Sequence, residues 1–371
     1  MLSALRPVGE RFPLRFAASD ENELGNIPDY QFHGFASGTQ ALAAAILHVR
    51  KQRADCTEPE VIIPAYTCPD VVSACVRAKV KPVLVDFAEN STQYDLASLK
   101  QRVTDQTIAI IAINFLGIPI DIPELRKVIG SKNIFVIEDS AQYFPRDIAK
   151  HDWQGDLVTL SFGRGKPLNL FYGGAVLSHS TVSFDTGFDF SENMLSRQKF
   201  AFKHRLYNTL MHPGLYFWIT QIPGLTLGQT YYQTCSLIES MNSDALAALI
   251  ERIKEYKTTE YNTKVLDWAK AISFNGQLIC HRSYKYLRLP FLVDDAAKLE
   301  FCESKPEFSK LGLSRMYRKI LPEFDDIPLD LGNSKDYPNA LSFSRRLFIL
   351  PVHGDVKSHH LKKVEQLLKK M

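Results

Sequence analysis

Continuous apolar runs alternate with amphipathic segments between residues 38 and 177. Six runs have the length and composition of buried strands: 61–63, 80–86, 108–115, 134–137, 157–160 and 175–177. Helical spacing of apolar residues occupies 38–50, 70–79, 95–102 and 121–129. Apolar strands that alternate with helices are typical of a parallel sheet covered on both faces. The pattern therefore predicts an α/β fold with a mostly parallel central sheet.

The pattern changes after residue 180. Segment 185–236 is rich in aromatic residues and reads as a helical insertion, and 243–271 has the spacing of one long helix. Strand-like 284–293 and 347–352 then alternate with helical 296–303 and 355–370. These shifts divide the chain into three parts: a large α/β domain of residues 1–240, a linking helix of 241–271 and a small α+β domain of 272–371. Residues 1–33 are expected to be irregular and to wrap the surface or a partner subunit.

Composition excludes several classes of protein. The 371 residues are 45% hydrophobic and carry a net charge of only +3, which gives no reason to expect a nucleic-acid partner. The longest apolar runs are too short to span a bilayer, and no apolar leader opens the chain. The six cysteines form no CxxC pair and no Cys/His metal spacing. They predict reduced thiols in a cytoplasmic protein without a metal site.

Polar residues follow the predicted strands at the points where ligands bind in parallel sheets. Asp139, Ser161 and Lys166 each come just after an apolar run, and Gly38 opens a helix capped by Ser37. A helix N-terminus and a serine suit a phosphate, and a lysine amine condenses with an aldehyde. Phosphate, ring nitrogen and aldehyde are the three handles of pyridoxal phosphate. Taken singly, these residues also fit a surface lysine, a turn and an ordinary helix cap.

Short motifs support the cofactor interpretation because they occur together and in order. The motifs are SGTQAL at 37–42, PAYT at 64–67, KPVLVD at 81–86, GIPID at 117–121, EDSAQ at 138–142, SF at 161–162 with Lys166, and GG at 173–174, with YPNA at 337–340 and LPVH at 350–353 as weaker matches. The set resembles the DegT/DnrJ/EryC1/StrS family of sugar-nucleotide aminotransferases, a branch of fold-type I pyridoxal-phosphate enzymes. The resemblance covers residues 34–180 and, more weakly, 284–371. It implies a fold-type I architecture with a smaller C-terminal domain.

The resemblance also implies roles for individual residues. Lys166 matches the lysine that forms a Schiff base with the cofactor, and Asp139 matches the partner of the pyridine nitrogen. A dehydratase branch of the family has histidine at the position of Lys166, so lysine favours transamination. The other implied cofactor contacts are Gly38, Thr39, Gln142 and Ser161.

Several positions depart from the family pattern. Cys68 stands where the family has an aromatic residue over the cofactor ring, so either Cys68 or Tyr66 is expected to cover the ring. Phe171 and Tyr172 replace a small and an acidic residue before the glycine pair. The family's contact to the partner subunit's phosphate has no clean match, and Asn242 is the nearest candidate. Possible substrate contacts are Tyr172, Arg288, Tyr317 and His353.

These observations predict a pyridoxal-phosphate-dependent aminotransferase of nucleotide-sugar and polysaccharide biosynthesis. It is expected to transfer an amino group, with glutamate as donor, to a keto sugar nucleotide. Two alternatives stay open: the same cofactor chemistry on a different carbonyl substrate, and a regulatory or scaffold relative without turnover. A homodimer is expected from the resemblance. The basic, aromatic segment 198–232 is interpreted as packing on the active-site mouth or the dimer partner, or as a membrane contact.

Overall fold

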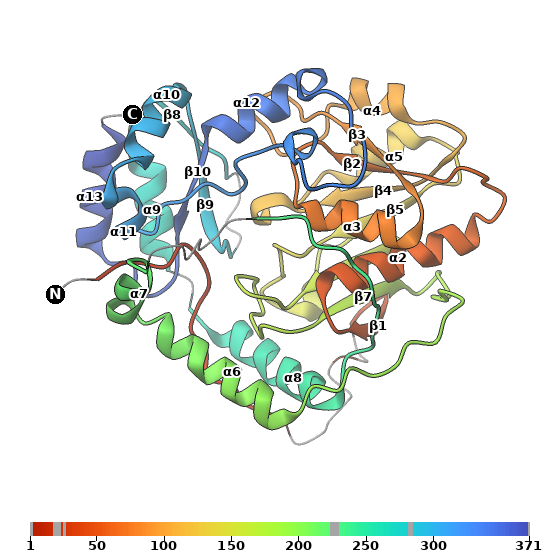
Figure 1. Ribbon diagram of the computed structural model, residues 1–371, viewed down its shortest axis with the longest axis horizontal. Coiled ribbons are helices and arrows are strands. Elements are labelled where there is room, and N and C mark those ends of the chain that lie inside the picture. The colour runs from red at the N-terminus through yellow and green to blue at the C-terminus, as the bar shows by residue number, and fades with distance from the viewer. Residues whose placement is uncertain are drawn as a thin grey trace.

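The computed structural model describes residues 3–17, 24, 27–222, 230–260, 262–280 and 285–369. Within this part of the chain a seven-stranded sheet forms the large domain, with the order β1-β7-β6-β5-β4-β2-β3 (Figure 1). Its strands are β1 (Tyr30–Phe35), β2 (Glu60–Pro64), β3 (Lys81–Val85), β4 (Thr107–Ile113), β5 (Phe135–Asp139), β6 (Leu157–Ser161) and β7 (Gly174–His179). The pairs from β3 to β6 are parallel, and β7 runs antiparallel to both neighbours. The predicted α/β fold is confirmed.

Helices cover both faces of this sheet because successive strand residues point to opposite sides. Ile63 and Ile111 pack in one apolar cluster with residues of α2 (Gly38–Gln52) and α3 (Pro69–Ala78). Ile62 and Ile110 pack in a second cluster with α4 (Leu96–Arg102) and α5 (Ile122–Ile129). Ser37, Asp95 and Asp121 cap α2, α4 and α5 by accepting hydrogen bonds from backbone N–H groups of their first turns.

A second, antiparallel sheet forms the smaller domain, drawn beside both chain ends in Figure 1. It contains β8 (Gly276–Leu278), β9 (Arg288–Val293) and β10 (Leu347–Pro351) in the order β10-β9-β8. Its helices are α9 (Thr263–Ala271), α10 (Ala296–Glu303), α11 (Pro306–Lys310), α12 (Pro338–Arg346) and α13 (Ser358–Leu368). Short 3₁₀ turns are η1 (Phe115–Gly117), η2 (Ile148–Lys150), η3 (Leu321–Glu323) and η4 (Ser334–Asp336).

The YPNA motif at 337–340 joins the two domains. The Asp86 carboxylate, just after β3, accepts the Asn339 N–H at 3.0 Å and the Ala340 N–H at 2.7 Å. Both donors lie in the first turn of α12, where N–H groups have no partner inside the helix. The motif therefore has a structural role, since it anchors α12 to the end of β3.

The prediction of one helix over 243–271 is wrong. The structure has α8 (Ser243–Thr258) and then α9 as separate helices. The Lys285 ammonium donates to the carbonyls of Tyr256 (2.7 Å) and Thr259 (3.2 Å), and the Thr259 hydroxyl bonds back to the Glu255 carbonyl. These contacts satisfy the last carbonyls of α8 and end it. Apolar periodicity continues across the break, so spacing alone did not reveal it.

The prediction that residues up to 33 are irregular is wrong for its last four positions. Residues 30–35 form β1, which pairs with β7 from Tyr30 opposite His179 to Phe35 opposite Gly174. The strand lies at the edge of the sheet and is only partly buried along its middle, so it lacks a strong apolar run. Of the N-terminal segment, residues 1–2, 18–23, 25 and 26 lie outside the described part, as does residue 284 of the strand predicted over 284–293.

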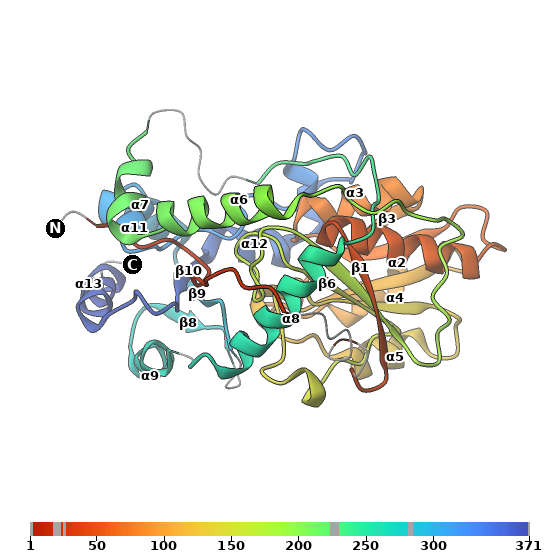
Figure 2. The same ribbon diagram turned by 90° about the horizontal axis from the view of Figure 1, so that it is seen from below.

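The predicted insertion contains two helices, α6 (Arg197–Leu210) and α7 (Pro213–Ile219). Figures 1 and 2 show α6 extending from α7, beside the small domain, toward the large domain. Residues 223–229 of the insertion lie outside the described part. None of the helices in the described ranges combines the length and apolar character needed to cross a membrane. All six cysteines are free.

Candidate active site

Lys166 lies in the loop that leaves the carboxyl end of β6. Gly165 and Gly173 give this loop its shape, with φ angles of 72° and 95° that other residues rarely adopt. A Cβ at Gly165 would come within 2.9 Å of the Val8 side chain, so the N-terminal segment packs directly on the loop. The Lys166 N–H donates to the Gly163 carbonyl at 3.3 Å. The lysine is therefore carried by a tightly folded loop with no freedom to extend.

Asp139 ends β5 and lies close to Lys166. Its side chain is buried, with 8% of the residue exposed, and it accepts the Ala141 N–H at 3.0 Å. Burial raises the pKa of Asp139 above its usual value, while the Ala141 N–H and the Lys166 ammonium act in the opposite direction. A carboxylate in this position is stabilised by any further cation that enters the crevice.

The loop after Asp139 is fixed by a buried polar network. The Asn114 amide donates to the Glu138 carboxylate at 2.8 Å and to the Ser140 hydroxyl at 3.1 Å. The Trp153 indole N–H also donates to the Ser140 hydroxyl, at 3.0 Å. Gln142 follows in the same loop, and its buried Oε1 has no hydrogen-bond partner among the described residues. A buried acceptor without a donor is costly, so this oxygen is ready to accept a hydrogen bond from a ligand.

The N-terminus of α2 meets Ser161 at the end of β6. A Cβ on Gly38 would lie 2.6 Å from both the Cβ and the Oγ of Ser161, so only glycine permits this approach. Gly174 is equally close, because its Cβ would lie 2.6 Å from the Gly38 nitrogen. Free N–H groups and the positive end of a helix dipole favour an anion here. The structure thus brings Gly38 and Ser161 together in one cradle, and phosphate binding by them stays a prediction.

Asp70 is a site residue that the sequence analysis missed. Burial raises the pKa of its carboxyl group, and hydrogen bonds from Cys68 and Thr39 and the charge of Lys166 act against that rise. Asp70 thus connects the phosphate cradle to the lysine loop. An aspartate in the first turn of a helix ordinarily compensates the helix dipole, so its sequence position carried no functional signal.

Tyr66 and Cys68 were the two candidates for covering a cofactor ring, and they differ in position. Tyr66 is completely buried, and its hydroxyl donates to the Tyr317 carbonyl (2.8 Å) and accepts the Tyr317 N–H (3.2 Å). The structure thus gives Tyr66 the role of joining the two domains, with no surface left for a ligand. Cys68 precedes α3 and is partly exposed. Burial of the sulfur raises the pKa of Cys68 to about 12, so the group stays a neutral thiol.

The small domain contributes Tyr317 and Arg288 to the same crevice. The Tyr317 hydroxyl hydrogen-bonds to the Cys68 sulfur. Arg288 begins β9, and its Nη1 donates to the thioether of Met316 at 3.2 Å. Its Nε is buried and has no partner among the described residues. Of the predicted substrate contacts, these two lie on the small-domain wall of the crevice.

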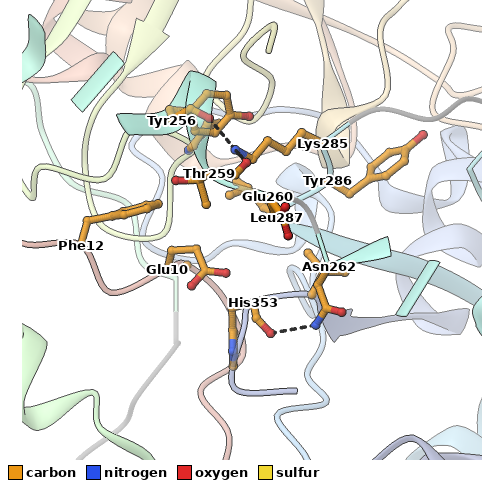
Figure 3. Close-up of a pocket in the computed structure, with 13 residues that line it drawn as sticks. Glu10, Phe12, Tyr256, Thr259, Glu260, Asn262, Lys285, Tyr286, Leu287 and His353 are labelled. Atoms are coloured by element: carbon orange, nitrogen blue, oxygen red, sulfur yellow. Dashed lines mark hydrogen bonds between the residues drawn. The ribbon is translucent and has the colours of Figure 1, made fainter. Parts of the chain in front are cut away.

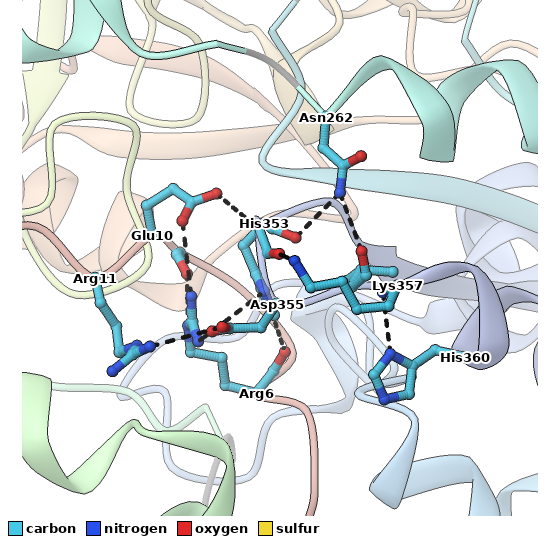
Figure 4. A network of polar contacts seen from close by, with 11 residues as sticks. Arg6, Glu10, Arg11, Asn262, His353, Asp355, Lys357 and His360 are labelled. Carbon is cyan, nitrogen blue, oxygen red and sulfur yellow. Dashed lines mark hydrogen bonds and ion pairs between the residues drawn. The ribbon is translucent and has the colours of Figure 1, made fainter.

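Asn242 and His353 have structural partners. Asn242 caps α8, with its Oδ1 accepting the Ala245 N–H (2.9 Å) and its Nδ2 donating to the Leu195 carbonyl (2.7 Å). His353 is buried in the network of Figure 4, where its Nε2 hydrogen-bonds to the Arg6 carbonyl at 2.9 Å. Burial lowers the pKa of His353 to about 3, so the ring is neutral. Both side chains thus have partners within the protein, and their predicted contacts to cofactor or substrate stay predictions.

Phe171 and Tyr172 connect the lysine loop to the insertion. The Phe171 ring lies 4.0 Å from the Tyr207 ring and 5.0 Å from the His204 ring, measured between centroids. The Tyr172 ring lies 6.1 Å from that of Phe200. All three partners belong to α6. The two aromatic residues therefore pack α6 against the loop that carries Lys166.

A small cavity lies behind this loop, lined by Pro167, Glu10, Tyr256, Lys285 and other residues drawn in Figure 3. Its accessible volume is about 40 Å³, which is room for about one water molecule. Burial lowers the pKa of Lys285 to about 8, but its ammonium is held by backbone carbonyls. The cavity is too small for a substrate. The candidate active site is instead the region where Lys166 lies close to Asp139 and Asp70.

Comparison with known proteins agrees with the arrangement of these residues. Residues 31–215 match the model of the DegT/DnrJ/EryC1/StrS aminotransferase family, and this range contains the lysine loop, Asp139 and the α2 cradle. The chain belongs to this family. The small domain and Arg288 lie outside the matched range. The family match therefore gives no information on the residues of the small domain that line the crevice.

Individual members of the family align with different parts of the chain. GDP-perosamine synthase from Escherichia coli O157:H7 is 30% identical over 155 residues, which are 40% of this chain and 41% of that protein. The dTDP-4-amino-4,6-dideoxy-D-glucose transaminase of Shigella dysenteriae is 24% identical over 91% of this chain and 84% of its own. A putative sugar aminotransferase from Streptococcus pneumoniae, Spr1654 in its PMP form, superposes with a TM-score of 0.67 at 16% identity, over 95% of this chain and 92% of its own. Such a likeness shows the shared fold.

The crevice fits the cofactor of the family in three respects. Asp139 is a buried carboxylate, whose ionised form a protonated ring nitrogen would stabilise. Gly38 brings the N-terminus of α2 against Ser161, and Gln142 Oε1 lacks a donor. Lys166 lies close to Asp139, and the charge of Lys166 acts to lower the pKa of Asp139. The described residues therefore offer a partner for each polar handle of pyridoxal phosphate.

Proposed function

We propose that this protein is a pyridoxal-phosphate-dependent aminotransferase that moves an amino group from glutamate to a keto sugar linked to a nucleotide. One observation carries the proposal: Lys166 and the buried carboxylate of Asp139 meet beside the α2 N-terminus and Ser161. Amine, carboxylate and anion cradle are the three groups that this cofactor needs.

Each residue has a defined task in the proposed reaction. Bound pyridoxal phosphate would supply an electron sink for the bond broken next to the amino group. Ser161 and the N–H groups at Gly38 and Thr39 bind the phosphate, and Asp139 keeps the ring nitrogen protonated. The Lys166 amine removes the proton from the amino-bearing carbon of the donor as a general base. The loop glycines and Val8 fix the backbone that carries Lys166.

The identity of the substrate is the part of the proposal that has the most alternatives. Cys68, Phe171 and Tyr172 differ from the family pattern, and two of them are committed to holding α6. A different carbonyl substrate for the same cofactor is the first alternative. A regulatory or scaffold relative without turnover is the second, and the preserved pairing of Lys166 with Asp139 counts against it.

The absorbance spectrum of the purified protein tests the cofactor. We expect a visible band after incubation with pyridoxal phosphate, and we expect Lys166→Ala to lose it while keeping the thermal melting temperature of the wild type. Adding glutamate should convert the band of the wild type to that of the aminated cofactor. Absence of any band would contradict the proposal. A panel of keto sugar nucleotides, tested with glutamate, then separates the leading substrate from other carbonyl compounds.

The proposal includes a homodimer that works in the cytoplasm. Support comes from large apolar side chains exposed in and after the insertion, among them Phe202 at 67% and Trp218 at 62%. The others on α6 and α7 and at their ends are Leu206, Leu210, Leu215 and Ile222. Exposed apolar surface of this kind usually contacts a partner. Mass photometry is expected to give twice the chain mass, and flotation with anionic liposomes separates a second copy from a membrane surface as the partner.

A further inference from the structure

Asp70 is a second carboxylate beside Lys166, carried by the first turn of α3. The Thr39 hydroxyl, at the start of α2, and the Cys68 thiol, just before α3, both donate hydrogen bonds to it. The Tyr317 hydroxyl of the small domain donates in turn to the Cys68 sulfur. These contacts fix the Asp70 carboxylate between two helix starts, at the point where the small domain meets the large one.

Asp70 has hydrogen-bond donors but no charged partner in contact. The Thr39 hydroxyl and the Cys68 thiol are neutral, since burial raises the pKa of Cys68 to about 12. Among the described residues, Lys166 is the cation whose charge lowers the pKa of Asp70, and it acts without a hydrogen bond to the carboxylate. Asp70 therefore depends on this lysine for the compensation of its charge.

Asp139 depends on the same lysine. The Lys166 charge acts to lower the pKa of Asp139, and the charge of Asp70 acts to raise it, so the two carboxylates repel each other while they share one ammonium. Two carboxylates and one ammonium leave an unbalanced negative charge, which is unfavourable in a partly buried crevice. A protonated ring nitrogen at Asp139, as in the proposed function, supplies the second cation and leaves Lys166 to Asp70.

The other titratable groups near Asp70 do not change this balance. Its charge also acts on Cys68, Cys235 and Tyr317, and burial raises the pKa of each of them, so all three are neutral near pH 7. Asp70 and Lys166 are both partly exposed, so each can exchange protons with water. In the described part of the chain, the charges that act on or respond to Asp70 in the crevice are therefore those of Lys166 and Asp139.

Compensation of the helix dipole would explain an aspartate in the first turn of α3 but not its surroundings. Asp244 stands at the same position of α8, as the second residue of its helix, and it pairs at the surface with Arg197 at 3.6 Å. Asp70 instead accepts two hydrogen bonds inside the candidate active site. Asp244 is thus a matched control, because it shares the helix position of Asp70 and lacks its neighbours.

We propose that Asp70 is a positioning residue for Lys166, an assignment that rests on the proposed function. Its carboxylate is the counter-ion of the ammonium that forms when the Lys166 amine takes the proton from the amino-bearing carbon of the donor. The proton moves from carbon to Nζ, and Asp70 stays ionised throughout. Asp139 remains free to pair with the ring nitrogen, so the two aspartates divide two cations between them.

A titration of the visible band of the cofactor-loaded protein tests this assignment. The band reports the protonated nitrogen that joins Lys166 to the cofactor, and a nearby anion stabilises that positive charge. Asp70→Asn keeps an acceptor oxygen and removes the charge, so we expect the midpoint of the titration to fall by about one pH unit. Asp70→Glu, which keeps the charge, and Asp244→Asn should leave the midpoint close to that of the wild type.

A second measurement needs no cofactor. Only an unprotonated amine reacts with acetic anhydride, so mass spectrometry of cofactor-free protein reports the fraction of Lys166 that is free. Loss of the counter-ion should make acetylation of Lys166 roughly 3- to 10-fold faster in Asp70→Asn at neutral pH. The exposed Lys335 serves as the internal reference and should react equally in all variants. The melting temperature of Asp70→Asn should not fall, because the repulsion of Asp139 has been removed.

The outcomes are distinct. An unchanged midpoint of the band in Asp70→Asn, unchanged acetylation of Lys166, or an equal shift in Asp244→Asn overturns the assignment. A lower melting temperature without either change would give Asp70 a purely structural role and would overturn it as well. If the wild type shows no band with pyridoxal phosphate, the proposed function fails, and the acetylation rates still decide whether Asp70 is the counter-ion of Lys166.

Discussion

Individual side chains of the crevice are held by neighbours from distant parts of the chain. Gly38 touches Ser161, and Cys68 is hydrogen-bonded by Tyr317. Burial raises the pKa of Asp139 at the centre of this arrangement, so a cation that approaches its carboxylate gains more than it would in water. The charge of Asp139, and not only its shape, is therefore expected to matter.

Replacing Asp139 by asparagine keeps the shape and removes the charge. We expect kcat of the cofactor-loaded protein to fall by roughly 100-fold or more, since a charge positioned against the reacting group is lost. KM for the amino donor should change little. Steady-state kinetics measure both constants. Asp95→Asn is the control, because asparagine also caps helices well, and it should leave both constants unchanged. Equal losses in the two variants would point to a general folding defect.

Much of the candidate site could be predicted at the scale of residues, because short stretches of sequence show where strands end and helices begin. Lys166, Asp139, Ser161 and Gly38 follow strand ends or open a helix, and a parallel sheet brings such positions together whatever the details of packing. Asp70 could not be found this way, because its contact with Lys166 depends on how two separate loops fold over the sheet edge. The burial of Tyr66 likewise depends on Tyr317, 251 residues further along the chain.

At the scale of elements, α6 packs on the loop that carries Lys166. It buries Phe200 and His204 and rests on Phe171 and Tyr172. Phe171 makes these contacts from a left-handed conformation, with φ of 61°, which is strained for a side chain of its size. The strain indicates that the contact with α6 is worth more than the conformational cost.

Two substitutions at Phe171 separate contact from strain. Phe171→Ala removes the contact of the Phe171 ring with α6 and keeps the strained φ. We expect it to destabilise the protein by about 2 to 4 kcal/mol and to make α6 accessible to protease. Phe171→Gly removes the contact and the strain, so it should be less destabilising by about 1 kcal/mol. Urea unfolding gives the free energies, and limited proteolysis with mass spectrometry locates the cuts. A more stable alanine variant would refute this explanation of the backbone conformation.

Element boundaries were predictable where local capping decides them and not elsewhere. Asp121 and Ser37 mark the starts of α5 and α2 in the sequence and in the structure. The end of α8 was missed because it is fixed by Lys285, 26 residues beyond Thr259. The strand β1 was missed because its partner β7 lies far along the chain.

On the scale of the whole molecule, buried neutral histidines make stability depend on pH. Burial lowers the pKa of His353 to about 3 and that of His204 to about 4. In the unfolded chain both take up protons near pH 6.5, while the folded protein does not until the lower values. The contribution is thus present above pH 6.5 and is lost as pH falls from there toward 4, by about 1.4 kcal/mol per pH unit for each histidine.

Urea unfolding at pH 7 and pH 5 measures this loss. We expect the free energy of unfolding to be smaller at pH 5 by a few kcal/mol, and the dependence to be shallower in His204→Leu than in the wild type. An equal pH dependence in His204→Leu and the wild type would contradict the burial of a neutral ring at position 204.

The segment of residues 5–8 contacts both distant parts of the sequence and the loop that carries Lys166. Arg6 is paired with Asp355, 349 residues away (Figure 4). The Leu5 N–H donates to the Lys310 carbonyl, and the Val8 side chain lies against Gly165. On a ribosome, residues 5 and 6 must therefore wait until residues 310 and 355 have emerged before they find their partners. Until then the loop that carries Lys166 lacks the packing contact of Val8. The chain consequently becomes competent to receive a ligand only after residue 355 has been made, however early its large sheet has formed.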